Sequence, residues 1–492
     1  MSHSRASTMR FVPAASPGVS VSSADSNATL YCLLLVVWGA LFLISWRSYY
    51  PVTDAAFFAL IAFATLIQPR IIPSLLLVTF FAPLCLEIDR PYVIAFGILI
   101  TTGLIRYSPA SRFANANTNL LSLLLLWLLY LVTAVLNSPA PGTALRLIFL
   151  QNVEGVVFVA VLLAFLDTER AASSVAKTIA ALGAGAFVIG LVHYLWRDDM
   201  WATTQFLRRA HDGGSDASSA FSILYGQIVL GGRILPSSQE PNYWAAQMHL
   251  PLWIAFGLAA SAREAKARWM WILCSALCLA AILGTYSRGA FLTLLALLAF
   301  YCVRARVKSF LPMAVLASAT AGMLLTAPLL LDRILGIQAE ISRHGGSGRL
   351  GLWSQALDLW LESPIFGAGL RGFQERTGLA VHNTYLSVLV DTGVIGLAIY
   401  LAVLIMGLTF WGRALTLARA RKSPQSIGIA VGGLYGMLGV FVNLLFVSAT
   451  DPRLPWLPVV LGFAFYRGLA RSAAVSADHE APECTPARLE TS

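Results

Sequence analysis

Long uninterrupted apolar runs, separated by shorter polar segments, fill most of the sequence from residue 28 to residue 467. A helix needs about 20 apolar residues to cross a bilayer, whereas a transmembrane β-strand alternates apolar and polar positions over about ten residues. The runs do not alternate, so they predict an all-α, polytopic transmembrane bundle of about 12 to 14 spans. The expected helices cover residues 28–45, 54–68, 71–87, 91–105, 118–137, 144–166, 172–196, 242–261, 269–286, 289–303, 310–331, 383–411, 426–448 and 455–467.

The polar segments divide these helices into groups. Two long loops interrupt the apolar pattern, and loops of such length usually carry function. The predicted segments are a disordered cytoplasmic N-terminus at 1–27, transmembrane helices at 28–196, an outer loop at 197–241, transmembrane helices at 242–331, a large outer loop with surface helices at 332–381, transmembrane helices at 382–471, and a disordered cytoplasmic tail at 472–492.

Basic residues set the expected orientation. Lys and Arg gather in alternate loops, at 106–112, 261–268, 303–308 and 412–422, while a loop such as 137–143 has none. Basic loops stay in the cytoplasm, so both termini are expected inside the cell and both long loops outside.

Composition narrows the class further. The chain of 492 residues is 58% hydrophobic and only 12% charged, against about a quarter charged in soluble domains. The formal charge of +10 is explained by topology, so we expect no nucleic-acid partner. Cys274 and Cys278 share a helix face without a nearby His or acidic residue, which favours small buried packing residues over a metal site. We expect no metal and no cofactor.

Several polar residues fall at the outer ends of the predicted helices, where basic residues should be rare. Arginine binds phosphate oxygens bidentately and stays charged, so an anionic ligand such as a diphosphate would explain the arginines. Taken singly, Arg288 could be a snorkelling anchor and Arg349 a solvated loop cation. The whole set is Arg233, Glu240, Asn242, Arg288, Arg349, Arg371, His382 and Asn383.

Two short segments position these residues. In SSQEPNYW (237–244), Pro241 fits the first position of a helix that Glu240 or Ser238 could cap. The stretch LGLWSQALDLWLESPIFGAG after Arg349 is amphipathic, and it predicts a helix that lies along the membrane surface through Leu352, Leu357, Leu359, Trp360 and Phe366.

His382 is the candidate base. The positive end of the helix that follows, and the nearby arginines, favour the neutral imidazole, which can accept a proton from a hydroxyl group. Asp391, nine residues on, would lie on the opposite face of the same helix and about 13 Å deeper. We therefore expect Asp391 to make a helix-to-helix contact rather than to orient His382.

At this point the motifs resemble a known family. SQEPNYWA, TYSRGAF, GRLGLWSQAL with SPIFGAGLRGF, and VHNTYLSVLVDTGVIGL follow one another as in the bacterial O-antigen ligase and O-antigen polymerase superfamily. The resemblance covers about residues 225–410. It implies a metal-independent glycosyltransferase of the inner membrane that moves a glycan from an undecaprenyl-diphosphate carrier to an acceptor hydroxyl at the periplasmic face.

The resemblance also assigns residues. It places Arg288, Arg349 and His382 on the family's key arginines and histidine, with the arginines on the diphosphate and His382 as base. Arg233, Glu240, Asn242, Arg371 and Asn383 remain candidates for substrate binding. The expected partners are the glycan donor, a lipid or glycan acceptor, the bilayer and other proteins of polysaccharide assembly.

A transporter and a structural scaffold are the alternatives to a glycosyltransferase. A solute or ion transporter would also have many spans and intramembrane carboxylates such as Glu154, but the sequence lacks the paired broken helices of many carriers. A structural scaffold leaves the outer arginines unexplained. Ligase, polymerase and protein glycosylation stay open, as do the sugar, its linkage and the oligomeric state.

Overall fold

The computed structural model describes residues 73, 77, 118–148, 154–166, 168–195, 241–285, 287–305, 349–448 and 453–480. The chain divides into two compact units, Met1–Leu60 and Ile61–Ser492, and every described residue belongs to the second. The helices expected at 28–45, 54–68, 91–105 and 310–331, and nearly all of 71–87, lie outside the described residues.

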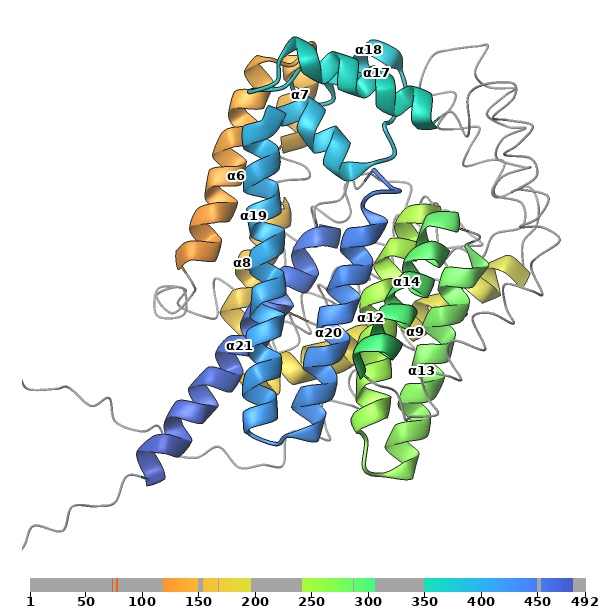
Figure 1. The fold of residues 1–492 in the computed structure, drawn as a ribbon, viewed down its shortest axis with the longest axis vertical. Coiled ribbons are helices and arrows are strands. Elements are labelled where there is room, and N and C mark those ends of the chain that lie inside the picture. Colours follow the sequence, from red (N-terminus) through yellow and green to blue (C-terminus); the bar gives the residue numbers. More distant parts are fainter. Residues whose placement is uncertain are drawn as a thin grey trace, which may run out of the picture. The chain divides into compact units, whose positions relative to one another are not determined.

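Within the described ranges, all regular structure is helical (Figure 1). The helices are α6 (Thr118–Leu136), α7 (Pro141–Leu147), α8 (Glu154–Phe165), α9 (Glu169–Leu195), α12 (Pro241–Ser261), α13 (Ala265–Gly284), α14 (Arg288–Ala305), α17 (Arg349–Glu362), α18 (Gly372–Thr377), α19 (Thr384–Ala420), α20 (Pro424–Asn443) and α21 (Arg453–Glu480).

Four of these helices contain stretches long and apolar enough to cross a bilayer: α9, α13, α19 and α20. Two shorter apolar stretches, Ser122–Leu136 and Arg288–Val303, lie in α6 and α14. The outer face of α6 exposes Leu125, Leu129 and Leu136 at 59%, 65% and 80%, which suits contact with lipid rather than water. The structure confirms an all-α polytopic membrane protein, while the number of spans remains a prediction.

The core forms where α12 packs against α20. Gly257 of α12 lies against the backbone of Gly428, and Gly432 lies against the backbone of Trp253, so a side chain at these glycines would collide with the facing helix. Small residues let transmembrane helices approach closely. Trp253 and Trp244 are fully buried beside this contact.

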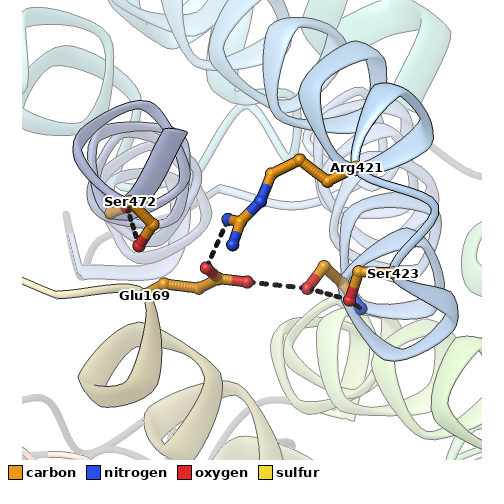
Figure 2. Close-up of polar contacts among 6 residues, drawn as sticks. Glu169, Arg421, Ser423 and Ser472 are labelled. Atoms are coloured by element: carbon orange, nitrogen blue, oxygen red, sulfur yellow. Dashed lines mark hydrogen bonds and ion pairs between the residues drawn. The ribbon is translucent and has the colours of Figure 1, made fainter. Parts of the chain in front are cut away.

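An ion pair joins three helices at the end of the bundle away from α17. Glu169, at the start of α9, pairs with Arg421 after α19 at 2.7 Å and accepts a hydrogen bond from Ser426 Oγ of α20 at 2.8 Å (Figure 2). Ser426 and Ser423 also share a hydrogen bond of 2.9 Å. This contact fixes the α19–α20 turn against α9.

At the other end, α17 and α18 cross over the tops of α6 and α19 (Figure 1). Helix α19 is broken at Gly393, where φ is 67° and ψ is −171°, values that only glycine adopts readily. The break lets Gly393 contact the backbone of Ile365, and Val394 N–H donates to the Pro364 carbonyl at 2.9 Å. The first turns of α19 are thereby separated from the long segment that follows.

Most described helix boundaries agree with the predictions to within a few residues, and α12 begins at Pro241 as predicted. Three helix ends were wrong. Helix α19 continues to Ala420, nine residues beyond the predicted end at 411. Helix α20 ends at Asn443 rather than continuing to residue 448, because residues 444–448 bond to another segment. Helix α21 continues to Glu480, although a disordered tail was predicted from residue 472; the alanines of this stretch favour a helix.

Candidate functional site

The candidate site is organised by residues 444–448, the non-helical segment that follows α20. In this segment Leu444 and Val447 are buried and Phe446 and Ser448 are half-buried. It contacts the beginnings of α14, α17 and α19. We call it the 444–448 segment. It brings together parts of the chain that are more than 90 residues apart in sequence.

His382 is held by this segment from one side. Its backbone N–H donates to Ser448 Oγ at 2.9 Å, and its φ of 55° places it in the left-handed region. Thr384 supports the same contact, because its N–H donates to the Leu444 carbonyl at 2.8 Å and its Oγ1 to the Val447 carbonyl at 2.6 Å. The hydrogen bonds of His382 and Thr384 therefore hold the chain around His382 against the 444–448 segment.

Asn383 caps α19. Its Oδ1 accepts a hydrogen bond from Leu386 N–H at 3.0 Å, so the helix starts at Thr384 and His382 precedes the cap. The prediction that His382 and Asp391 lie on one continuous helix was wrong, since the backbone of His382 is not helical.

Arg349 reaches the same segment from α17. It is the first residue of that helix, is half-buried, and its guanidinium donates to the Phe446 carbonyl at 3.3 Å. One turn further, Trp353 Nε1 donates to the Val381 carbonyl at 3.0 Å. Helix α17 is thus bonded both to the 444–448 segment and to the residue that precedes His382.

Arg288 starts α14, and its neighbour Gly289 contacts the segment. A Cβ on Gly289 would lie 2.6 Å from Cβ of Phe446, so this position has room only for glycine. Ser287 Oγ accepts from Ala290 N–H at 3.4 Å and caps the helix. Helix α14, which begins with the half-buried Arg288, therefore starts against Phe446, the residue whose carbonyl binds Arg349.

Asp391 belongs to a different contact. The carboxylate of the half-buried Asp391 accepts hydrogen bonds from the backbone N–H groups of Arg371 and Gly372, at the start of α18. The expected helix-to-helix role is therefore met by a helix cap, which lies at the outer end because the break at Gly393 follows two residues later. The predicted depth of about 13 Å assumed a continuous helix.

The remaining predicted residues fall elsewhere. Arg371 has a φ of 57° and donates through Nε to Gln374 Oε1 of α18 at 2.9 Å, while its backbone N–H donates to Asp391 of α19. Asn242 is half-buried in the first turn of α12. Arg233 and Glu240 lie outside the described residues.

Sequence reasoning missed the 444–448 segment. Leu-Leu-Phe-Val-Ser continues an apolar run, which is indistinguishable from helix by periodicity. The one signal was the polar stretch Ser-Ala-Thr-Asp-Pro at 448–452, since Ser, Asp and Pro favour turns.

These features define a polytopic α-helical membrane protein with two arginines and a histidine docked at one end of its bundle. Residues 273–401 match the family described as O-Antigen ligase. The matched residues include Arg288, Arg349 and His382, but not the 444–448 segment.

One curated relative is the exopolysaccharide production protein ExoQ of Rhizobium meliloti (strain 1021). It is 29% identical over 131 residues, a stretch that covers 23% of this chain and 29% of the relative's length.

Proposed function

We propose that the protein is a membrane glycosyltransferase that moves a glycan from an undecaprenyl-diphosphate carrier to an acceptor hydroxyl during synthesis of a bacterial surface polysaccharide. The observation that carries the proposal is the common docking of three chain segments, those of Arg288, Arg349 and His382, on residues 444–448. The O-antigen ligase match and the likeness to an exopolysaccharide production protein support the substrate class.

The proposed chemistry divides the work between these residues. The bond between the anomeric carbon of the glycan and the diphosphate oxygen breaks, and the acceptor oxygen bonds to that carbon. Arg288 and Arg349 stabilise the negative charge that develops on the departing lipid diphosphate. His382 takes the proton of the acceptor hydroxyl. This division requires no metal, and metal independence remains part of the proposal.

The proposed active site faces the periplasm of the bacterial inner membrane. Basic residues support this orientation, because they gather at the end of the bundle opposite α17, in the α12–α13 and α19–α20 connections. They are Arg263, Lys266, Arg268, Arg419, Arg421 and Lys422. By the positive-inside rule this end is cytoplasmic, as both termini would be.

The acceptor distinguishes a ligase from a polymerase. A ligase would pass the glycan to a lipid acceptor and a polymerase to another repeat unit, while both use the same donor. Cells that lack a polymerase would carry a single repeat on their surface, whereas cells that lack a ligase would accumulate polymer on the carrier. The transporter alternative is not favoured by the comparisons.

Transfer by the full-length protein in vesicles tests the proposal. His382→Ala should reduce product formation by about 10²- to 10⁴-fold, the usual effect of losing a general base. Arg349→Ala should reduce it by about 10²-fold or more. Arg376→Ala is the matched control, because Arg376 is exposed and pairs with Glu362 at 2.7 Å, away from the 444–448 segment. Wild-type turnover by the His382→Ala protein would refute the assignment.

A further inference from the structure

Helix α17 has three distinct faces. One face packs into a small core, in which Ala356 and Leu359 are buried and Leu352, Trp353 and Trp360 are partly buried against Phe373, Val381 and Val390. A second face exposes Gln355, Asp358 and Glu362. A third exposes leucines only a few residues from those charges: Leu350 at 63%, Leu357 at 42% and Leu361 at 62%.

The three exposed leucines lie within about 40° of one another around the helix, at 100° per residue, and the polar face is turned roughly 110° away. A helix that lies in a membrane interface shows such a division into apolar and polar faces. A helix is present where the surface helix was predicted, but Leu352, Leu359 and Trp360, which were expected on the membrane side, face the protein core instead. We call Leu350, Leu357 and Leu361 the leucine stripe.

The leucine stripe is continuous with the lipid-facing surface of α6. Ile365 and Phe366, just after α17, are each 53% exposed. Ile365 is fixed to α6 by a hydrogen bond of 3.3 Å from Tyr130 Oη to its carbonyl, beside the 65% exposed Leu129. An apolar surface therefore runs from the side of α6 across the Ile365 turn to the leucine stripe.

The other end of the stripe meets the candidate site. Leu350 directly follows Arg349, whose guanidinium is bonded to the Phe446 carbonyl. A lipid chain that lies on the stripe would therefore place its polar end beside Arg349. An isoprenoid diphosphate has this combination of a long apolar chain and an anionic end.

We propose that the leucine stripe binds the isoprenoid chain of the donor and leads it from the bilayer, past Ile365 and Phe366, to Arg349. This inference rests on the proposed function, because it takes the donor to be a lipid-linked diphosphate. The polar face of α17 stays in water, and the core face holds the helix at a fixed distance from His382 through the Trp353–Val381 hydrogen bond.

Photocrosslinking tests the contact without requiring turnover. Benzoylphenylalanine is placed at position 350, 357 or 361 of the full-length protein in phospholipid vesicles that contain undecaprenyl diphosphate. We expect crosslinks to undecaprenyl diphosphate at these three positions and none at position 355, on the polar face. Crosslinks to phospholipid alone, or equal crosslinking at position 355, would overturn the proposal. The same measurement in the His382→Ala protein should be unchanged.

A kinetic test separates this inference from the proposed function. Leu357→Ser should raise the KM for a donor with an undecaprenyl chain by about tenfold, the effect of removing one buried aliphatic side chain. The KM for a donor with a two-isoprene chain, too short to cover the stripe, should change less than twofold. Gln355→Ala, on the exposed polar face, serves as control. An equal rise for both donors would reject the stripe, whereas no transfer by the wild type with either donor would reject the proposed function.

Discussion

Ser448 offers the sharpest test of how the fold positions His382. Ser448→Ala removes the acceptor of the 2.9 Å hydrogen bond from the His382 N–H. Leaving this part-buried N–H without its partner costs up to about 1–3 kcal/mol, and a non-glycine residue in the left-handed region already costs roughly 1–2 kcal/mol. Together these terms favour a different backbone conformation at residue 382.

The expected kinetic effect depends on the hydrogen bonds that Ser448→Ala leaves intact. A loss of about 1–3 kcal/mol corresponds to about a 5- to 150-fold shift in a conformational equilibrium. The two hydrogen bonds of Thr384 to the 444–448 segment persist, so we expect kcat to fall about tenfold. The KM for the donor should stay within about twofold, because Arg349 binds the Phe446 carbonyl and not Ser448.

Transfer kinetics of the full-length protein in vesicles provide the assay, with thermal unfolding as a check on stability. Ser448→Thr keeps the hydroxyl group and should retain most activity. Ser472→Ala is the control, since its Oγ donates a hydrogen bond to the Gly468 carbonyl at 3.0 Å, at the far end of the bundle (Figure 2). If Ser448→Ala turned over as fast as Ser472→Ala, the reasoning about His382 would be refuted.

Other positions give predictions of different kinds. Gly393→Ala should reduce the yield of folded protein severely, because the backbone conformation there costs about 1–3 kcal/mol for other residues and a Cβ would collide with the chain after α17. The control is Gly412→Ala, because a Cβ there would have nothing within 4 Å. Gly412→Ala should be tolerated in the same melting and yield measurements. Asp391→Ala should lower stability by about 1–3 kcal/mol through loss of the α18 cap, and chemical denaturation that found no change would contradict that role. Removing Glu169 or Arg421 should lower the free energy of unfolding by less than about 1 kcal/mol, since their side chains are 21% and 33% exposed; a double-mutant cycle would measure the pair, and turnover should not change.

The helices themselves were predictable from sequence. Apolar length alone gave α12, α13 and α14 to within four residues at each end, and Pro241 marked a helix start because proline suits the first turn. The arginine and histidine candidates could also be found, since their charge and position near helix ends are written in the sequence.

The tertiary contacts could not be predicted in the same way. The break in α19 depends on Ile365, which lies 28 residues before Gly393 and contacts it only after folding. A continuous helix was therefore the simplest interpretation of the apolar run, and it missed the kink that follows two residues after Asp391. The faces of α17 were equally hidden, because the leucines that face the core and those that face lipid have the same side chain.

The dependence of His382 and Arg349 on residues 444–448 limits how the protein can be recombined with its relatives. Consider a chimera that takes only residues 273–401, the stretch that matches the O-antigen ligase family, from a relative. The positions of Arg349 and His382 would then come from the relative, while residues 444–448, which bond to them, would come from this protein. Mismatched pairs would assemble in the membrane and still transfer poorly. A transplant intended to change donor preference should therefore carry everything from α13 through the end of α20 and the five residues beyond it.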